Sequence, residues 1–309
     1  AQLFVATLDA RGIAGAARLV SRGIDGDVPS KPFGDDADYA WAPDGKSMVF
    51  AARIAGRTEP WSTNFDLYLA TVDGAEAPLN LTAANPATDA GPVYSPDGRT
   101  LYYRAMKRPG FEADRFQIRA LDLASRNARD IAADWDRSPE GLVVAPDGRT
   151  LYPTVAALGA GSLFAVDVAS SKRTRLDNRG TVAGVTVGRD AIVYGRDDLK
   201  STAQLYRLSP RGGEPVALTR FNAARMAGLA LGDYEQFTFA GWNGETVHAY
   251  LVKPANFSAG TKYPLAFLIH GGPQGSFGNH FHYRWNPQTY AGQGYAAVMV
   301  DFHGSTGYG

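Results

Sequence analysis

Tyr94-Ser95-Pro96-Asp97-Gly98 is the middle one of three near-identical turns in this chain of 309 residues. The other copies are Trp41-Ala42-Pro43-Asp44-Gly45 and Val144-Ala145-Pro146-Asp147-Gly148, and a degenerate copy is Val187-Gly188-Arg189-Asp190. Proline presets φ for a turn, aspartate hydrogen-bonds to the backbone beyond it, and glycine accepts a positive φ. The aspartates stand at 44, 97, 147 and 190, at intervals of 53, 50 and 43 residues, so the chain contains an internal repeat.

Strand-like runs surround each of these turns. A run such as 46–52 follows the turn, a further run such as 65–72 comes next, and short fourth runs such as 78–82 and 215–219 end the units. Four short antiparallel strands in each unit of ~40–50 residues are the signature of a β-propeller blade. A β-sandwich is the alternative, but sandwiches do not repeat one turn at this spacing. The sequence therefore predicts an all-β propeller with four-stranded blades.

The predicted propeller occupies residues 1–233 and begins in the middle of a blade, because residues 1–8 resemble a third strand and 17–20 a fourth. A propeller that starts in this way is incomplete or is closed by chain outside the sequence. We therefore expect residues upstream of Ala1. The expected blades lie near residues 1–20, 33–82, 88–131, 138–176 and 181–219.

A different pattern covers residues 234–309 and predicts the N-terminal part of an α/β-hydrolase domain. Alternating runs on both sides of Asn243-Gly244 indicate a β-hairpin. The apolar run 263–270 predicts a strand buried on both faces of a mostly parallel sheet. A helix is expected at 285–293, where Pro287 suits the first turn, and a second buried strand at 294–301.

The first of these strands runs into His270-Gly271-Gly272-Pro273, a turn with chemical meaning. Two consecutive glycines let the backbone turn sharply and let a substrate oxygen approach their N–H groups. In α/β-hydrolases the loop after the third strand contributes one N–H to the oxyanion hole. A plain exit from a strand into a loop is the alternative.

Composition excludes several classes of function. The 31 Lys and Arg balance the 31 Asp and Glu, so the net charge is 31 − 31 = 0, and neither nucleic acid nor a membrane is an expected partner. The chain has no cysteine, which excludes disulfides, thiolate metal sites and a cysteine nucleophile. His280, His282 and His303 indicate a metal cluster only weakly, since His280 and His282 alternate in a glycine-rich loop without a carboxylate at ligand spacing, so neither a metal nor another cofactor is expected.

Taken in order, the motifs resemble the prolyl oligopeptidase family of serine peptidases, and most of all its acylaminoacyl-peptidase and dipeptidyl-peptidase 5 branch. The resemblance covers essentially the whole chain, although the family more often has arginine where this chain has His303. It implies a propeller that caps an α/β-hydrolase domain, with a Ser-Asp-His triad at their interface. Besides the Pro-Asp-Gly turns, the motifs are Phe239-Ala240-Gly241-Trp242-Asn243-Gly244, Lys253-Pro254, His270-Gly271-Gly272-Pro273-Gln274-Gly275 and Gly304-Ser305-Thr306-Gly307-Tyr308-Gly309.

The resemblance also implies that the triad is not in this chain. The nucleophile of the family lies in a Gly-x-Ser-x-Gly elbow, and the sequence contains no such motif; Gly304-Ser305-Thr306-Gly307 has the wrong spacing. We therefore expect the 309 residues alone to be inactive. The parent protein is expected to be a serine exopeptidase that removes dipeptides or acyl-amino acids from the N-terminus of short peptides, with the propeller as a size filter.

Candidate site residues follow from the resemblance and from loop lengths. Gly272 and its neighbour Gly271 are the expected oxyanion-hole donors, and His270 and Pro273 are expected to hold the loop. The long loops 54–64 and 106–115 are expected on the propeller face opposite the Pro-Asp-Gly turns, where a carboxylate could hold a substrate ammonium. Solvated loops are the alternative. The candidate substrate-binding residues in these loops are Glu59, Trp61, Glu112, Asp114 and Arg115.

Two other functions stay open at this point, a propeller-capped esterase or lipase and a non-catalytic propeller that binds partners. The expected partners are a peptide substrate, the remainder of the hydrolase domain and the missing propeller strands. A homo-oligomer is also open. The resemblance slightly favours a periplasmic or secreted location over a cytoplasmic one.

Overall fold

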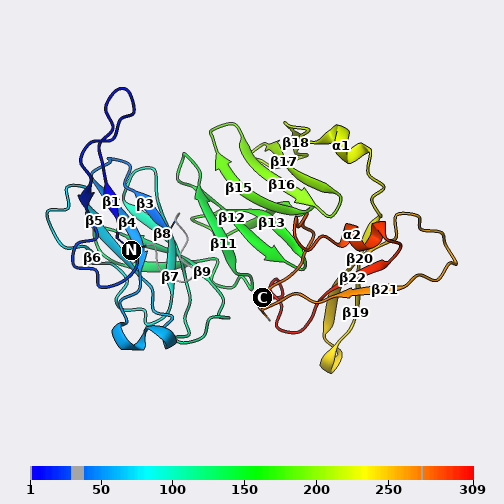
Figure 1. The fold of residues 1–309 in the computed structure, drawn as a ribbon. Helices are drawn as coiled ribbons and strands as arrows, with labels where there is room; N and C mark the ends of the chain where they lie inside the picture. The colour runs from blue at the N-terminus through cyan, green and yellow to red at the C-terminus, as the bar shows by residue number, and fades with distance from the viewer. Residues whose placement is uncertain (1, 29–37, 273) are drawn as a thin grey trace. The chain divides into compact units, whose positions relative to one another are not determined.

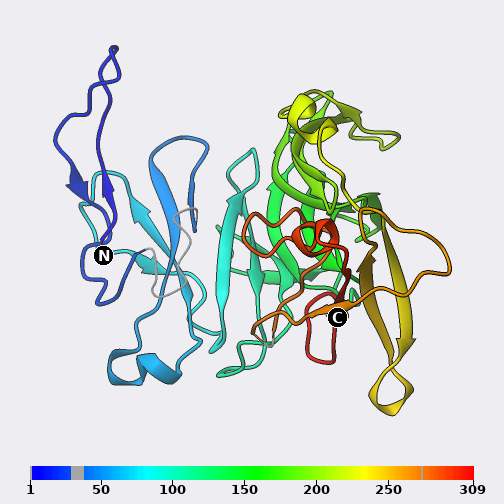
Figure 2. The ribbon, with the colours of Figure 1, turned by 45° about the vertical axis from the view of Figure 1, so that its right-hand side comes forward.

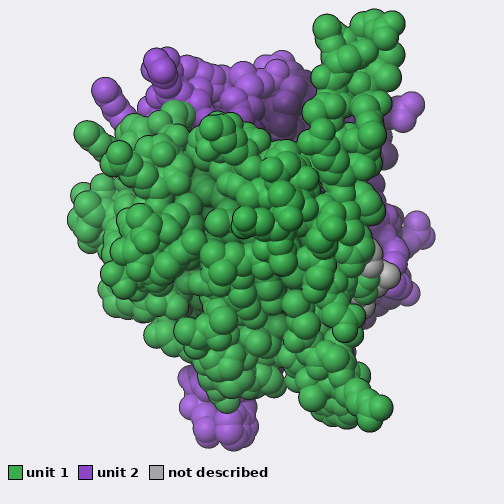
Figure 3. Space-filling model, turned by 90° about the vertical axis from the view of Figure 1, so that its left-hand side faces the viewer, with its two compact units in different colours: residues 1–135, 146–151, 167–172 green, residues 136–145, 152–166, 173–309 purple. Residues whose placement is uncertain are grey.

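The computed structural model describes residues 2–28, 38–272 and 274–309, and the chain divides into two compact units, coloured separately in Figure 3. Unit 1 comprises residues 1–135, 146–151 and 167–172, and unit 2 comprises residues 136–145, 152–166 and 173–309. Pro273 and the start of the blade predicted at 33–82 lie outside the described residues. Within the described ranges, no helix combines the length and the apolar character that crossing a membrane requires.

Unit 1 consists of antiparallel sheets whose strands neighbour one another in chain order (Figure 1). β1 (Phe4–Val5) and β2 (Arg18–Leu19) form a pair, and a short 3-10 helix, η1 (Gly56–Trp61), lies between two strands of the next sheet. That sheet contains β3 (Tyr39–Trp41), β4 (Ser47–Ala52), β5 (Asp66–Thr71) and β6 (Leu79–Asn80). The following sheet contains β7 (Asp89–Tyr94), β8 (Thr100–Ala105), β9 (Gln117–Asp122) and β10 (Ala128–Ile131).

The predicted Pro-Asp-Gly turns are confirmed, and all three have the same geometry. Their glycines, Gly45, Gly98 and Gly148, have φ angles of 68°, 71° and 70°, in the left-handed region that glycine tolerates best. In each turn the aspartate Oδ1 accepts a hydrogen bond from the backbone N–H two residues later, at 2.9, 3.1 and 2.9 Å. The repeat seen in the sequence is therefore a structural repeat as well.

The core of unit 1 uses both faces of the β3–β6 sheet. Val49 and Ala51 face the β7–β10 sheet and pack in one cluster with Leu101. Met48 and Phe50 point to the opposite face, as alternation along a strand requires, and pack in a second cluster that includes Val20. Because both faces are covered, this strand is almost continuously apolar instead of alternating.

Unit 2 contains two larger groups of strands. β11 (Pro139–Val144), β12 (Thr150–Ala157), β13 (Ala160–Asp167) and β14 (Arg173–Asp177) are followed by β15 (Thr181–Val187), β16 (Ile192–Asp198), β17 (Ser201–Leu208) and β18 (Val216–Ala217). β13 and β14 pair antiparallel, β15 to β18 pair antiparallel in succession, and a parallel pair between Gly161 and Thr181 joins the two groups into one eight-stranded sheet. A short helix, α1 (Ala223–Ala227), follows.

The last sheet of unit 2 has the spatial order β19 (Tyr234–Ala240), β20 (Thr246–Val252), β22 (Ala296–Asp301) and β21 (Leu265–Leu268). The hairpin predicted at Asn243-Gly244 is confirmed: β19 and β20 pair in full register around the one-turn helix η2 (Trp242–Gly244), as Figure 2 shows in yellow. The predicted helix is confirmed as α2 (Pro287–Gly292), with Asn286 Oδ1 accepting the Gln288 N–H at 2.9 Å.

The prediction that the 263–270 strand is buried on both faces is wrong. Leu265, Phe267 and Ile269 are 61%, 53% and 64% exposed. The reason is that β21 is an edge strand, paired only with β22, and no element of the described chain covers the face that carries these side chains. The sheet is also mixed, since β21 and β22 are parallel whereas the other two pairs are antiparallel. The second predicted strand, β22, is buried as expected.

Distant parts of the sequence meet inside unit 2. Arg137 Nη1 donates to the carbonyl oxygen of Tyr308 at 2.9 Å, across 171 residues of sequence. The Leu158 N–H donates to the carbonyl oxygen of Gly307 at 3.1 Å. These contacts attach the C-terminal loop to the region of β11–β13.

Candidate active-site loop

The loops that leave β21 and β22 lie at one edge of the sheet. Because the two strands are parallel and adjacent, their carboxyl ends meet there, which is where open α/β sheets place ligands. The first loop follows Leu268 and contains His270-Gly271-Gly272, and the second, residues 302–309, follows Asp301. The structure therefore brings the predicted glycine turn against the Gly304–Gly309 motif.

The two glycines of the turn differ in conformation. Gly272 has a φ of 132°, and a Cβ added there would lie 2.5 Å from the backbone nitrogen of Gln274, whereas a Cβ on Gly271 would meet nothing within 4 Å. Within the described part of the chain, neither N–H donates a hydrogen bond. Both glycines are exposed, so their N–H groups are open to an incoming acceptor.

His270 connects the two loops. Its Nδ1 lies 2.8 Å from the Gly271 carbonyl oxygen, and its Nε2 lies 2.7 Å from Ser305 Oγ. A carbonyl oxygen can only accept, so Nδ1 carries the hydrogen, and in the neutral ring Nε2 accepts from the Ser305 hydroxyl. The ring also stacks on Phe302, with centroids 4.4 Å apart and planes 10° apart. The imidazole is thus fixed on both edges and on one face.

Two further hydrogen bonds brace the same loop. The Thr306 N–H donates to the Gly275 carbonyl oxygen at 2.8 Å, and Ser276 Oγ donates to Asp301 Oδ1 at 2.8 Å. Asp301 is the last residue of β22 and is buried. Burial raises the pKa of Asp301, and the hydrogen bond from Ser276 opposes that rise. The glycine turn is therefore held at its two ends by His270 and Ser276.

The segment that follows, residues 279–281, is anchored to the β15–β17 region of the same unit. Asp197 Oδ1 accepts from the Phe281 N–H at 3.1 Å and lies 2.8 Å from His280 Nδ1. The hydrogen bond to Asp197, together with its charge, raises the pKa of His280 against the opposing effect of burial. Asn279 adds a third link, since its Oδ1 accepts from the Leu199 N–H at 3.0 Å.

The histidines considered as metal ligands have separate contacts. His280 pairs with Asp197, His303 Nδ1 lies 2.7 Å from Glu245, and His282 Nδ1 accepts the N–H groups of Arg284 and Trp285. In residues 2–28, 38–272 and 274–309, no three His, Asp or Glu side chains form a group that could hold a metal ion.

The candidate substrate-binding residues all belong to unit 1, and the structure brings their two loops together. The Gly110 N–H of one loop donates to Thr63 Oγ1 of the other at 2.9 Å. Three of the side chains make contacts within the unit, whereas Glu112 is exposed and Trp61 is 75% exposed. The Glu59 carboxylate forms an ion pair with Arg53 at 3.0 Å. Asp114 accepts hydrogen bonds from the N–H groups of Lys107 and Arg108. Arg115 donates a hydrogen bond to the carbonyl oxygen of Trp135.

Sequence reasoning assigned no role to Ser305, Ser276 or Asp301. Ser305 belongs to the Gly304–Gly309 motif, and nothing in the sequence indicates that it meets a histidine 35 residues earlier. Asp301 carried a usable signal, because a carboxylate directly after a buried apolar strand marks the carboxyl edge of a sheet.

Comparison with known proteins adds the family. No protein-family model matches the sequence. The chain is 34% identical over 296 residues to a probable dipeptidyl-peptidase 5 of Emericella nidulans, and 33% identical over 307 residues to a dipeptidyl-peptidase 5 of Aspergillus fumigatus. These alignments cover 91% and 94% of this chain. The chain belongs to the prolyl oligopeptidase family.

Solved structures agree with this family in fold. An acylaminoacyl peptidase of Pyrococcus horikoshii superposes with a TM-score of 0.74 at 19% identity, covering 98% of this chain and 44% of that one. A puromycin-hydrolyzing peptidase of Mycobacterium tuberculosis gives 0.65 at 19% identity, covering 88% and 43%. The chain spans about two fifths of the length of the curated relatives it matches, 41% and 42% in the two fungal proteins.

Proposed function

We propose that this chain is part of a serine exopeptidase that removes dipeptides or acyl-amino acids from the N-terminus of short peptides. The observation that carries the proposal is the 34% identity to a probable dipeptidyl-peptidase 5, which extends over 91% of the chain and includes the glycine turn. That turn lies at the carboxyl edge of a β-sheet, with two N–H groups open to an acceptor.

The proposed architecture assigns residues 1–233 to a β-propeller and residues 234–309 to the start of an α/β-hydrolase domain. The successive antiparallel four-strand groups support the first assignment, and the parallel pair of β21 and β22 followed by loops at one edge supports the second. A propeller over the hydrolase site would act as a size filter, because a folded protein could not enter between them.

In the proposed mechanism, the N–H groups of Gly272 and Gly271 donate to the oxyanion that forms when a serine attacks the substrate carbonyl. His270 acts as a positioning residue that holds the turn through Ser305. The serine, its histidine base and the aspartate would come from the part of the full protein outside this chain, since the chain contains no Gly-x-Ser-x-Gly. Acylation and hydrolysis of the acyl-enzyme would then follow as in other serine hydrolases.

The first test compares substrates in the full-length protein. Dipeptidyl arylamides, N-acetyl-amino acid arylamides and short acyl esters are supplied in parallel, and the 309-residue chain alone serves as the inactive control. Preference for an arylamide supports the peptidase proposal, and turnover of esters alone contradicts it. Absence of any turnover in the full-length protein would favour a binding propeller.

The second test concerns the turn itself. Gly272→Ala places a Cβ against Gln274 N in a backbone conformation with a φ of 132°, so it displaces the N–H from its position. Loss of an oxyanion donor costs ~3–4 kcal/mol, or roughly 10²–10³ in kcat. Gly271→Ala is the matched control, because its Cβ meets nothing within 4 Å. Equal activity of the two variants would contradict the proposed role of Gly272.

A further inference from the structure

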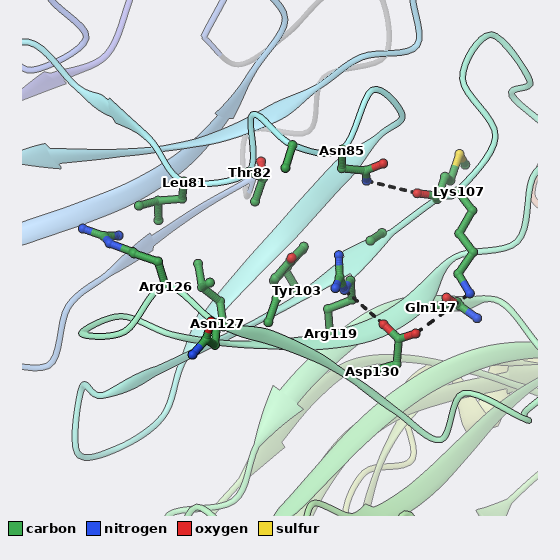
Figure 4. Close-up of a pocket in the computed structure, with 15 residues that line it drawn as sticks. Leu81, Thr82, Asn85, Tyr103, Lys107, Gln117, Arg119, Arg126, Asn127 and Asp130 are labelled. Atoms are coloured by element: carbon green, nitrogen blue, oxygen red, sulfur yellow. Dashed lines mark hydrogen bonds and ion pairs between the residues drawn. The ribbon is translucent and has the colours of Figure 1, made fainter.

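Unit 1 contains a cavity of about 390 Å³ that the proposed peptidase mechanism does not use. It lies between the end of β6 with the loop after it and the strands β8, β9 and β10, as Figure 4 shows. Its volume falls in the range of ~300–1,000 Å³ that is typical of small-molecule sites. The floor and walls combine small apolar residues such as Leu81 and Ala105 with several polar side chains.

Gln117 is the first sign that the cavity suits a ligand. It is 4% exposed and lines the cavity, and no hydrogen bond to its side chain occurs within the described part of the chain. Buried side-chain amides are normally hydrogen-bonded, because a buried donor or acceptor without a partner costs ~1–3 kcal/mol. An unpartnered amide that faces a cavity can instead bind a water molecule or a ligand. A primary amide offers a donor and an acceptor side by side, which complements another amide group.

The charges on the wall form the second sign. Arg119, Lys107 and Arg126 line the cavity with one acidic residue, Asp130, so the lining carries three positive charges against one negative. Asp130 Oδ1 lies 3.0 Å from Arg119 Nε, and Asp130 Oδ2 lies 3.9 Å from Lys107 Nζ. Figure 4 shows Arg119 near the middle of the cavity, with Lys107 at one end and Arg126 at the other.

The guanidinium of Arg119 has donors to spare. It presents five N–H groups, and among the described residues it forms an ion pair with Asp130, in which Nε makes no hydrogen bond, and interacts with the hydroxyl of Tyr103. Tyr103 is buried next to it on β8 and stays protonated, since burial raises the pKa of its phenol to about 12. Arginine beside a neutral hydroxyl and a side-chain amide suits a carboxylate, which accepts bidentate hydrogen bonds from guanidinium.

We propose that this cavity binds a small organic acid that carries an amide group. Its carboxylate contacts Arg119 and Lys107, its amide pairs with Gln117, and its apolar part lies against Leu81. The site is separate from the glycine turn and does not depend on the proposed peptidase activity.

The test uses the 309-residue chain and N-acetyl-L-leucine as the probe, with binding followed by isothermal titration calorimetry. A ligand of this size should bind with a Kd of about 1 mM. N-acetyl-L-leucinamide, which lacks the carboxylate, should bind at least about tenfold more weakly, which corresponds to loss of one good charge-assisted contact. Acetate, which lacks the amide, should show no saturable binding in the same range.

Variants locate the site. Gln117→Leu and Lys107→Met should each weaken binding about tenfold, and Lys107 is an exposed residue whose replacement leaves the core intact. Arg99→Met is the matched control, because it removes an exposed positive charge in the turn before β8, outside the cavity, and should leave the Kd unchanged. Lack of saturable binding, equal binding of the leucinamide, or an unchanged Kd in both cavity variants would each overturn the proposal.

Discussion

Asp89 gives the strongest prediction of stability in this protein. It is the first residue of β7, it is 0% exposed, and its Oδ1 accepts a hydrogen bond from Asn85 Nδ2 at 3.0 Å. Burial raises its pKa from 3.8 to about 7, the hydrogen bond from Asn85 opposes that rise, and the charge of Asp66 adds to it. The folded protein therefore holds a proton on Asp89 at pH values where the unfolded chain has released it.

The sign of the pH dependence follows from this proton. Between pH 3.8 and about 7 the unfolded state binds fewer protons at this site than the folded state, so stability falls as the pH rises through that window. A pKa difference of one unit between the folded and unfolded states corresponds to about 1.4 kcal/mol of unfolding free energy. The loss of unfolding free energy across the whole window therefore approaches about 4 kcal/mol. Below pH 3.8 the carboxyl is protonated in both states and contributes no difference.

Asp89→Asn removes the titrating group while keeping a side chain of the same shape. We expect the variant to match the wild type near pH 4 and to exceed it by about 2–4 kcal/mol at pH 8. Urea denaturation followed by tryptophan fluorescence at pH 4, 6 and 8 measures the difference in unfolding free energy between the variant and the wild type. Titrating groups that the two proteins share contribute equally to both and cancel in this difference.

A control variant is available in the turn before β8. The Ser95 hydroxyl and the Arg99 N–H lower the pKa of Asp97, so its contribution to stability is lost only as the pH falls below 3.8. Asp97→Asn should therefore give a difference from the wild type that is constant from pH 4 to 8. A constant difference for Asp89→Asn as well, or a variant less stable at pH 8, would refute the argument.

Three further predictions concern buried polar contacts. Asp177→Ala should destabilise the protein by ~3–5 kcal/mol in urea denaturation, because it leaves the nearly buried Arg196 guanidinium without its counter-ion. In the wild type Arg196 Nη1 lies 2.6 Å from the Asp177 carboxylate. A loss below ~1 kcal/mol would contradict this prediction. In NMR titration His280 should titrate above 6.5, so that the stabilisation by its ion pair is complete below pH 6.5 and is lost as the pH rises through the folded-state pKa. Asp197→Asn should lower the pKa of His280, because burial then acts without the opposing charge of Asp197, and an unmoved titration would argue against the pair. Gln288→Leu should cost ~1–3 kcal/mol per buried group left unpaired, since this side chain makes three hydrogen bonds to backbone groups, and a stability equal to that of the wild type would contradict the assignment.

The sequence predicted those parts of the fold that depend on local chemistry. The Pro-Asp-Gly turns and the Asn243-Gly244 hairpin formed as expected, because proline, aspartate and glycine determine the backbone within a few residues. The strand at 263–270 also formed, but an apolar run does not reveal whether a neighbouring element covers it, and here one face is exposed.

For the candidate site too, the sequence predicted the local turn but not the contact between distant loops. The glycine turn could be found from the order of residues, whereas its contact with Ser305 depends on the parallel pairing of β21 and β22, two strands that begin far apart in the sequence, at Leu265 and Ala296. The loop residues Glu59 and Asp114 were chosen for their charge, and the structure shows each of them paired inside its own unit. In a long loop, a carboxylate can accept hydrogen bonds from the loop's own backbone as readily as it can bind a ligand.

The division of the sequence between the two units has a consequence for synthesis on the ribosome. Unit 1 includes no residue beyond 172, so its whole sequence is made before most of unit 2. Unit 2 cannot be completed in this way, because Arg137 meets Tyr308 across 171 residues. At ~5–20 residues per second that interval is roughly 10–30 s. During that interval the region of β11–β13 lacks the hydrogen bonds that residues 307 and 308 make to it in the complete unit.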